Sequence, residues 1–195
     1  MLLHFNMQKY LFIDRDGTLI ESPPSPQQID SIEKLQFYPF VITWLAKIIT
    51  ELNYKLVLVT NQNGLGTYAY PLHTFNTVQN FMLDVLKKEG IFFSEIIIDS
   101  SYPADNSPLR KPRIGRMTNY INNPNIDIQN SFVIGDRYTD IQFAKNLGCK
   151  GIILNPQNQR GLGELTDTVE KLKNNYTALA TPHWQDIYLF LKAQS

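Results

Sequence analysis

Short apolar runs alternate along this chain with segments in which apolar residues recur at helical spacing. The apolar runs lie at 10–13, 56–59, 96–98, 131–134 and 151–154. Between them, apolar stripes at 41–52 and 75–86 predict two amphipathic helices, and 137–147 predicts a third that ends at Gly148. Five buried strands joined by helices are typical of a parallel sheet that is covered on both faces. We therefore expect an α/β fold with three layers.

The length of the chain, 195 residues, fits a single domain over 1–195 with a core at about 8–155. Residues 156–195 should add C-terminal helices, one of them indicated by the apolar spacing over 165–172. The proline-rich stretch 22–26 predicts an irregular loop, because proline blocks both a helix and a central strand.

Composition narrows the class of protein. Lys and Arg together number 18, as do Asp and Glu, so no overall positive field recruits nucleic acid or an anionic membrane. Cys149 is the only cysteine, which excludes an internal disulfide and a thiolate metal cage. The amino terminus lacks the pattern of a signal peptide, and the longest apolar segment, 40–49, is interrupted by Lys47 and is too short to cross a bilayer. We expect a soluble cytoplasmic protein without a nucleic-acid or membrane partner.

The first apolar run ends in Asp14-Arg15-Asp16-Gly17-Thr18. Two carboxylates two residues apart at the end of a buried strand repel each other and are costly to desolvate, and a divalent cation or a phosphoryl-transfer mechanism would relieve that cost. Gly17 permits a sharp backbone turn. An ordinary acidic turn, with Asp as a helix cap, is the alternative interpretation of these five residues alone. Arg15 points away from Asp14 if the segment stays extended, and we assign it no role.

Polar residues follow two further predicted strands at the same end. Thr60 and Asn61 follow the second strand and Asp136 follows the fourth, while Asp140 comes four residues later on the same side of a helical turn. Ligands of open α/β sheets bind at the carboxyl ends of strands. The basic pair 110–111 would supply a cation for these carboxylates and a bound anion. Taken separately, the two aspartates could be a cap and a surface residue, and the basic pair could be a solvated loop.

Together these motifs resemble the four motifs of the haloacid dehalogenase-like phosphatases, in the same order along the chain. The resemblance is carried by Asp14-x-Asp16-Gly17-Thr18, Thr60, Lys111 and Gly135-Asp136-x-x-x-Asp140. It covers about 10–155 and implies a Rossmann-like parallel sheet with strand order 3-2-1-4-5. The intervals between the motifs have no room for a large cap domain, so the site should be open or covered only by loops.

Longer segments resemble one branch of this family, the histidinol-phosphate phosphatase group, which forms the phosphatase half of a bifunctional histidine-biosynthesis enzyme. Its nearest relatives are the heptose bisphosphate phosphatases. The segments are 12–21, 60–67 and 103–105, the last of which precedes Arg110-Lys111-Pro112. The stretch 181–191 resembles the linker before a dehydratase domain in bifunctional members, and we expect this chain to be monofunctional.

The resemblance implies a phosphomonoesterase that acts through an aspartyl-phosphate. Asp14 would be the nucleophile, and Asp16 would protonate the leaving alcohol and then deprotonate the attacking water. Asp14, the main-chain carbonyl of Asp16, and Asp136 would hold Mg²⁺, and Asp140 would orient a metal-bound water or Lys111 without binding the metal itself.

The phosphoryl oxygens would be held by Thr60, the Asn61 amide and Lys111. The expected substrate is a small phosphorylated metabolite, L-histidinol phosphate. D-glycero-D-manno-heptose 1,7-bisphosphate is the alternative. A nucleic-acid 3′-end phosphatase is disfavoured by the balanced charge, and a catalytically idle binding module is disfavoured because every motif residue is present. Oligomeric state is not predicted.

Candidates for contact with the rest of the substrate are Glu21, Gln62 and Arg110. Glu21 would pair with the ammonium group of histidinol phosphate, and a solvated loop carboxylate is the alternative for this residue.

One departure from the branch concerns metal binding. Many members carry a structural zinc loop of three Cys and one His before the Arg-Lys-Pro segment. The matching positions here are Asp99, Ser101, Ser107 and Leu109, which offer neither a thiolate nor an imidazole. We therefore expect no structural zinc and a loop, 99–109, that is held by packing.

Overall fold

The computed structural model describes residues 7–23 and 28–194, which form a six-stranded sheet in the order β3-β2-β1-β4-β5-β6. Each neighbouring pair of strands is parallel. The predicted order of the first five strands is confirmed. The strands are β1 (Lys9–Ile13), β2 (Tyr54–Asn61), β3 (Phe93–Asp99), β4 (Phe132–Gly135), β5 (Lys150–Ile153) and β6 (Thr177–Ala180).

Strand β6 was not predicted, because the segment 156–195 was expected to add only helices. Its four residues, Thr-Ala-Leu-Ala, are half-buried or exposed at the edge of the sheet, so they form no apolar run. The central strands differ: Leu11, Phe12 and Ile13 are fully buried, and all four residues of β4 are buried. Burial on both faces explains why the central strands could be recognised and β6 could not.

The three helices predicted from periodicity form close to the expected bounds. They are α1 (Val41–Glu51), α2 (Leu72–Lys88) and α4 (Tyr138–Leu147). The apolar stripe of α1 is buried through Val41, Leu45 and Ile48. Helix α4 ends at Gly148, whose φ of +96° is a conformation that favours glycine. The remaining helices are α3 (Thr118–Ile121), α5 (Val169–Asn175) and α6 (Trp184–Ala193), with short 3₁₀ turns at Ile32–Lys34, Pro103–Asp105 and Leu162–Glu164.

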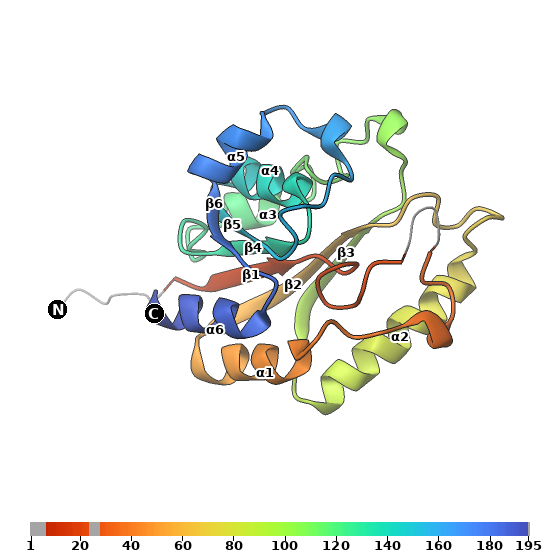
Figure 1. The fold of residues 1–195 in the computed structure, drawn as a ribbon, viewed down its shortest axis with the longest axis horizontal. Helices are drawn as coiled ribbons and strands as arrows, with labels where there is room; N and C mark the ends of the chain where they lie inside the picture. The colour runs from red at the N-terminus through yellow and green to blue at the C-terminus, as the bar shows by residue number, and fades with distance from the viewer. Residues whose placement is uncertain (1–6, 24–27, 195) are drawn as a thin grey trace.

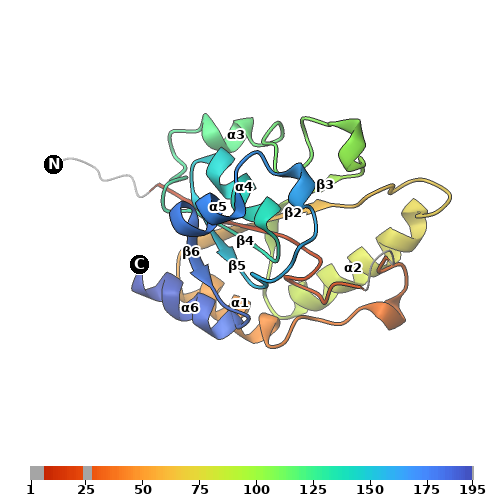
Figure 2. The same cartoon turned by 45° about the horizontal axis from the view of Figure 1, so that its top comes forward.

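The helices cover both faces of the sheet, which gives the three layers expected (Figure 1). Helices α1, α2 and α6 pack on one face around a core that includes Leu45 and Met82, and α3, α4 and α5 lie on the other. The turned view in Figure 2 brings α4 and α5 forward over β4 and β5. The buried Trp184 at the start of α6 donates from its indole N–H to the main-chain carbonyl of Thr18 at 3.1 Å, so this helix supports the loop after β1.

Only loops and short turns join the strands and helices on the side where the strands end. No cap domain is inserted between the motifs in the described ranges, as the short intervals predicted. Within those ranges, no helix combines the length and the apolar character that crossing a membrane requires. Part of the predicted proline-rich loop, 24–27, lies outside the described residues.

Candidate active site

The loop after β1 turns sharply at the first motif. The N–H of Asp14 still donates to the Ile134 carbonyl of β4 at 2.9 Å, which keeps the end of β1 beside the end of β4. Gly17 then adopts a φ of +84°, and a Cβ at this position would lie 2.4 Å from Oδ2 of Asp136. A glycine is therefore required both by the backbone conformation and by the close approach of the two motifs.

Lys111 lies between two buried carboxylates. Its ammonium donates to Oδ1 of Asp14 and to Oδ1 of Asp140, each at 2.8 Å. Burial by itself lowers the pKa of Lys111, but the two carboxylates outweigh burial and raise it, so the side chain is a cation at neutral pH. Asp140 also accepts from the N–H of Arg137 at 3.2 Å, which fixes it at the start of α4.

Asp136 completes a cluster of three buried carboxylates. Oxygens of Asp14, Asp136 and Asp140 all lie within 4.8 Å of one another. Burial raises the pKa of Asp136 to about 7, with Arg137 opposing the shift and the other two carboxylates adding to it. Its Oδ2 accepts from Nδ2 of Asn158 at 2.6 Å, whereas its buried Oδ1 has no hydrogen-bond partner in the described part of the chain. The contact of Oδ1 is an ion pair with Nε of Arg137 at 3.4 Å. Crowded carboxylate oxygens, one of them without a hydrogen bond, fit Mg²⁺, a hard cation that takes oxygen ligands.

Asn61 joins the second motif to Lys111. Its side chain donates to the Lys111 carbonyl at 2.9 Å and accepts from the Lys111 N–H at 3.1 Å. The sequence predicts the Asn61 amide as a phosphate ligand, and this stays a prediction; the side-chain amide binds the main chain of Lys111. The neighbouring Thr60 is buried at the end of β2, and its hydroxyl accepts from Nε2 of Gln62 at 2.9 Å.

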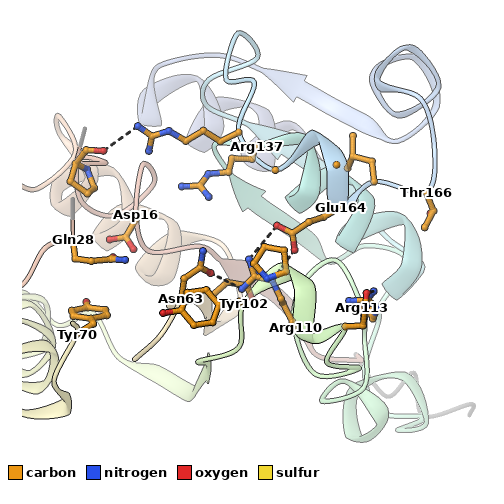
Figure 3. Close-up of a pocket in the computed structure, with 18 of the residues that line it drawn as sticks. Asp16, Gln28, Asn63, Tyr70, Tyr102, Arg110, Arg113, Arg137, Glu164 and Thr166 are labelled. Carbon is orange, nitrogen blue, oxygen red and sulfur yellow. Dashed lines mark hydrogen bonds and ion pairs between the residues drawn. The ribbon is translucent and has the colours of Figure 1, made fainter. Parts of the chain in front are cut away.

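Asp16 faces a cavity of about 1040 Å³, which Arg137, the residue after Asp136, also lines (Figure 3). Arg15 and Gln62 each donate to one of its oxygens, at 2.9 and 2.7 Å. Gln62 was a substrate candidate, yet its amide nitrogen is engaged by Asp16 and Thr60. Tyr70 also lines this cavity, and its hydroxyl lies 3.3 Å from Oε1 of Gln62.

Arg110, the second substrate candidate, reaches the same cavity but is already paired. Its guanidinium binds both carboxylate oxygens of Glu164, at 2.7 and 3.2 Å, and donates to Oδ1 of Asn63 at 2.8 Å (Figure 3). The cavity has a cationic wall that comprises Arg110, Arg113, Arg137 and Arg160. Glu164 and Asn158 were not predicted, since both lie in the irregular segment after β5 and carry no motif.

Glu21, the third candidate, is not brought to this cavity. It lines a smaller cavity of about 420 Å³ together with Tyr38 and Trp44, near the start of α6. Its N–H donates to the carbonyl of Gln36 at 2.8 Å. The short distance in sequence between Glu21 and Asp16 did not indicate which cavity Glu21 lines, because the chain turns between them.

The four positions that match a zinc loop are joined by hydrogen bonds. Oδ1 of the buried Asp99 accepts from both the N–H and the hydroxyl of Ser101, and Oδ2 lies 3.4 Å from the hydroxyl of Ser107. The Ser107 oxygen in turn accepts from the N–H of Leu109 at 3.2 Å. The sequence suggested packing alone for this loop, and the structure adds a polar cluster that is centred on Asp99.

Comparisons with known proteins find relatives in sequence and in fold. The family model described as HAD-hydrolase-like matches residues 108–161, a segment that contains Lys111, Asp136 and Asp140. The histidine biosynthesis bifunctional protein HisB of Bacteroides fragilis is 49% identical over 186 residues, which are 95% of this chain and 48% of that protein. HisB of Spirosoma linguale is 44% identical over 188 residues, 95% of this chain and 49% of that protein. The chain thus spans about half the length of these curated relatives.

Solved structures share the fold at lower identity. D,D-heptose 1,7-bisphosphate phosphatase from B. bronchiseptica, solved with magnesium and phosphate, aligns with a TM-score of 0.77 at 20% identity and covers 96% of this chain and 100% of that one. A putative HAD-like phosphatase from Mesorhizobium loti aligns with a TM-score of 0.72 at 21% identity, over 96% and 87% of the two chains. In its motifs, fold and relatives, the chain is similar to the haloacid dehalogenase-like hydrolases, the family whose model matches residues 108–161.

Proposed function

We propose that this protein is a Mg²⁺-dependent phosphomonoesterase that dephosphorylates L-histidinol phosphate. The observation that carries the proposal is the buried Lys111 ammonium, 2.8 Å from both Asp14 and Asp140, beside a third carboxylate and an open cavity. A cation held against a nucleophile and a metal cluster neutralises the charge of an incoming phosphate. The identity to two HisB proteins over 95% of the chain supports histidinol phosphate as the substrate.

In this proposal, Asp14 attacks phosphorus and forms an aspartyl-phosphate, which divides a slow hydrolysis into two easier steps. Asp16 gives a proton to the leaving alcohol and later takes one from the water that cleaves the acyl-phosphate. Lys111 and Thr60 bind the phosphoryl oxygens. Asn61 serves by holding the main chain of Lys111 in place.

Mg²⁺ would be held by Asp14, the main-chain carbonyl of Asp16, and Asp136. Asp140 would position Lys111 through their ion pair. When bound, the ion supplies positive charge that lowers the repulsion between a carboxylate nucleophile and a phosphate anion. We propose no structural zinc, because Asp99 and two serines make a poor zinc site. Stoichiometric zinc in chelator-treated, magnesium-free protein would contradict this.

Heptose 1,7-bisphosphate is a second candidate substrate. Four arginines line the cavity. Arg110 pairs with Glu164 and Arg137 with Asp136, whereas Arg113 and Arg160 form no ion pair within the described residues, so the wall has positive charge for a second phosphate. The B. bronchiseptica protein whose fold is similar to that of this chain is named for that substrate. Nucleic acid is disfavoured by a formal net charge of zero. A cytoplasmic location and the absence of a membrane partner stay predictions from the sequence.

The test is phosphate release, with and without Mg²⁺, from histidinol phosphate, heptose bisphosphate and a 3′-phosphorylated oligonucleotide. We expect turnover of histidinol phosphate that requires Mg²⁺ and is lost in Asp14→Asn. Preference for heptose bisphosphate would keep the chemistry and replace the substrate. A folded protein that releases phosphate from none of the three would refute the proposed activity.

A further inference from the structure

Both oxygens of Asp16 are held by donors from the protein. Nη1 of Arg15 donates to Oδ1 at 2.9 Å, and Nε2 of Gln62 donates to Oδ2 at 2.7 Å. The donors come from different elements, since Arg15 precedes Asp16 in the loop after β1 and Gln62 follows β2. A side chain held at both oxygens by separate elements has one orientation toward the cavity.

Arg15 is fully buried, and this is costly for a charged group unless its charge is used. The guanidinium carbon lies 5.0 Å from the centre of the Phe75 ring of α2, so the ring packs against the cation. Its Nε and Nη2 make no hydrogen bond within the described residues, and its one ion pair there is with Asp16. Asp16 is therefore the carboxylate that compensates the buried charge of Arg15.

The Gln62 amide connects three groups of the site. Besides Asp16, its nitrogen donates to the Thr60 hydroxyl at 2.9 Å, and its Oε1 accepts from the Tyr70 hydroxyl at 3.3 Å. Burial raises the pKa of Tyr70 to about 12, so this phenol keeps the proton that it donates. A single amide thus ties the proposed proton-transfer group to the proposed phosphate ligand.

We propose that Arg15 and Gln62 are positioning residues that hold Asp16 in the orientation for proton transfer, with Oδ2 as the oxygen that carries the exchangeable proton. Because Oδ1 accepts from the Arg15 cation, it is the less basic of the two oxygens, and the proton is favoured on Oδ2. A carboxyl oxygen has two lone pairs, so Oδ2 can accept from Gln62 on one side and bind the proton on the other. This inference rests on the proposed function, because it assigns Asp16 its role.

Asp16 transfers a proton in each of the two steps of hydrolysis. As Asp14 bonds to phosphorus, the bond from phosphorus to the leaving oxygen breaks and the Asp16 proton moves to that oxygen. As water then bonds to phosphorus, the bond from phosphorus to Asp14 breaks and a proton of the water returns to Asp16. A leaving group that is weakly basic needs no proton in the first step, but the second step still needs Asp16.

The experiment compares histidinol phosphate with p-nitrophenyl phosphate in Gln62→Leu, which removes both donated bonds at similar volume. We expect turnover of both substrates to fall about 10- to 100-fold, the loss typical of a hydrogen bond to a charged group. With p-nitrophenyl phosphate, the first step is retained and the second is slowed, so nitrophenolate should appear in a rapid burst equal to the enzyme concentration. With histidinol phosphate, no such burst of the alcohol is expected.

Gln79→Leu is the matched control, because Gln79 is also buried, makes no side-chain hydrogen bond in the described structure and does not line the cavity. It should keep the turnover of the unaltered protein. Arg15→Met should reproduce the Gln62→Leu burst, and Gln62→Leu alone still tests the inference if that variant does not fold.

An equal loss on both substrates without a burst would overturn the inference, because a smaller active fraction produces that result. Unchanged turnover in Gln62→Leu would overturn it as well. Either result with an active unaltered protein leaves the proposed function standing. An unaltered protein that hydrolyses neither substrate would refute the proposed function, and this inference with it.

Discussion

Replacement of Lys111 by Met removes one charge from the centre of the site at nearly constant volume. The ammonium lies 2.8 Å from a carboxylate oxygen of Asp14 and 2.8 Å from one of Asp140, and all three side chains are buried. Removing one partner of a buried ion pair costs about 3–5 kcal/mol, because the remaining charges are left without compensation. We expect Lys111→Met to lose about that much unfolding free energy in magnesium-free buffer.

The matched control is Lys34→Met. Lys34 pairs with Asp30 at 2.6 Å, a distance as short as those at Lys111, but the two side chains of this pair are 46% and 42% exposed. An exposed pair contributes about 0–1 kcal/mol. Urea denaturation of both variants at pH 7, with chelator present, separates the two cases. Added Mg²⁺ should restore part of the lost stability in Lys111→Met, because the cation takes over some of the missing charge.

The same variant tests the role of Lys111 in catalysis. Loss of one group that stabilises developing charge lowers turnover about 10²- to 10³-fold, and Lys34→Met should leave turnover unchanged. The reasoning is refuted if Lys111→Met and Lys34→Met lose similar stability of less than about 1 kcal/mol. That result would mean that the Lys111 ammonium is not desolvated between the carboxylates.

Three further predictions concern other parts of the site and core. Gly17→Ala places a Cβ 2.4 Å from an oxygen of Asp136, whereas a Cβ in Gly66→Ala, also at positive φ, meets nothing within 4 Å. The temperature of thermal unfolding and the rate of phosphate release should therefore fall far more in Gly17→Ala than in Gly66→Ala. Glu164→Gln removes the carboxylate from the cationic wall and should tighten competitive inhibition by inorganic phosphate, and weaker inhibition would contradict this. Burial raises the pKa of the Cys149 thiol to about 12 from 9, so its contribution to stability is complete below pH 9 and is lost as pH rises toward 12. Urea titrations between pH 8 and pH 10 should show this decline in the unaltered protein and a flatter curve in Cys149→Ala.

The parts of the fold that were predictable are those with a local signal. Residues 11–13 of β1 and the residues of β4 are buried on both faces and therefore form continuous apolar runs, and the stripe of α1 repeats at helical spacing. Strand β6 has no such signal, because an edge position leaves its short residues partly exposed. In the site, the aspartates of the motifs follow strands and could be placed at the carboxyl ends of those strands.

The partners of those motif residues could not be placed in this way. Glu164 reaches Arg110 from 54 positions later in the sequence, and Asn158 reaches Asp136 from the same irregular segment. Glu21, although only five residues beyond Asp16, faces a different cavity. Hydrogen bonds between distant loops depend on the path of the whole chain, and no short-range pattern records them.

The strand order explains why one lysine from a loop can bind a carboxylate after β1 and another in the helix that follows β4. In the order β3-β2-β1-β4, strand β1 lies between β2 and β4, so the ends that carry Asp14, Thr60 and Asp136 are neighbours. Lys111 follows β3, which is separated from β1 by β2, and it must therefore cross the end of β2 to reach Asp14. Asn61 lies at that crossing and binds both main-chain groups of Lys111. The residue that places the cation is thus the last residue of the strand that the loop must cross, which accounts for an asparagine there whether or not its side chain touches a substrate.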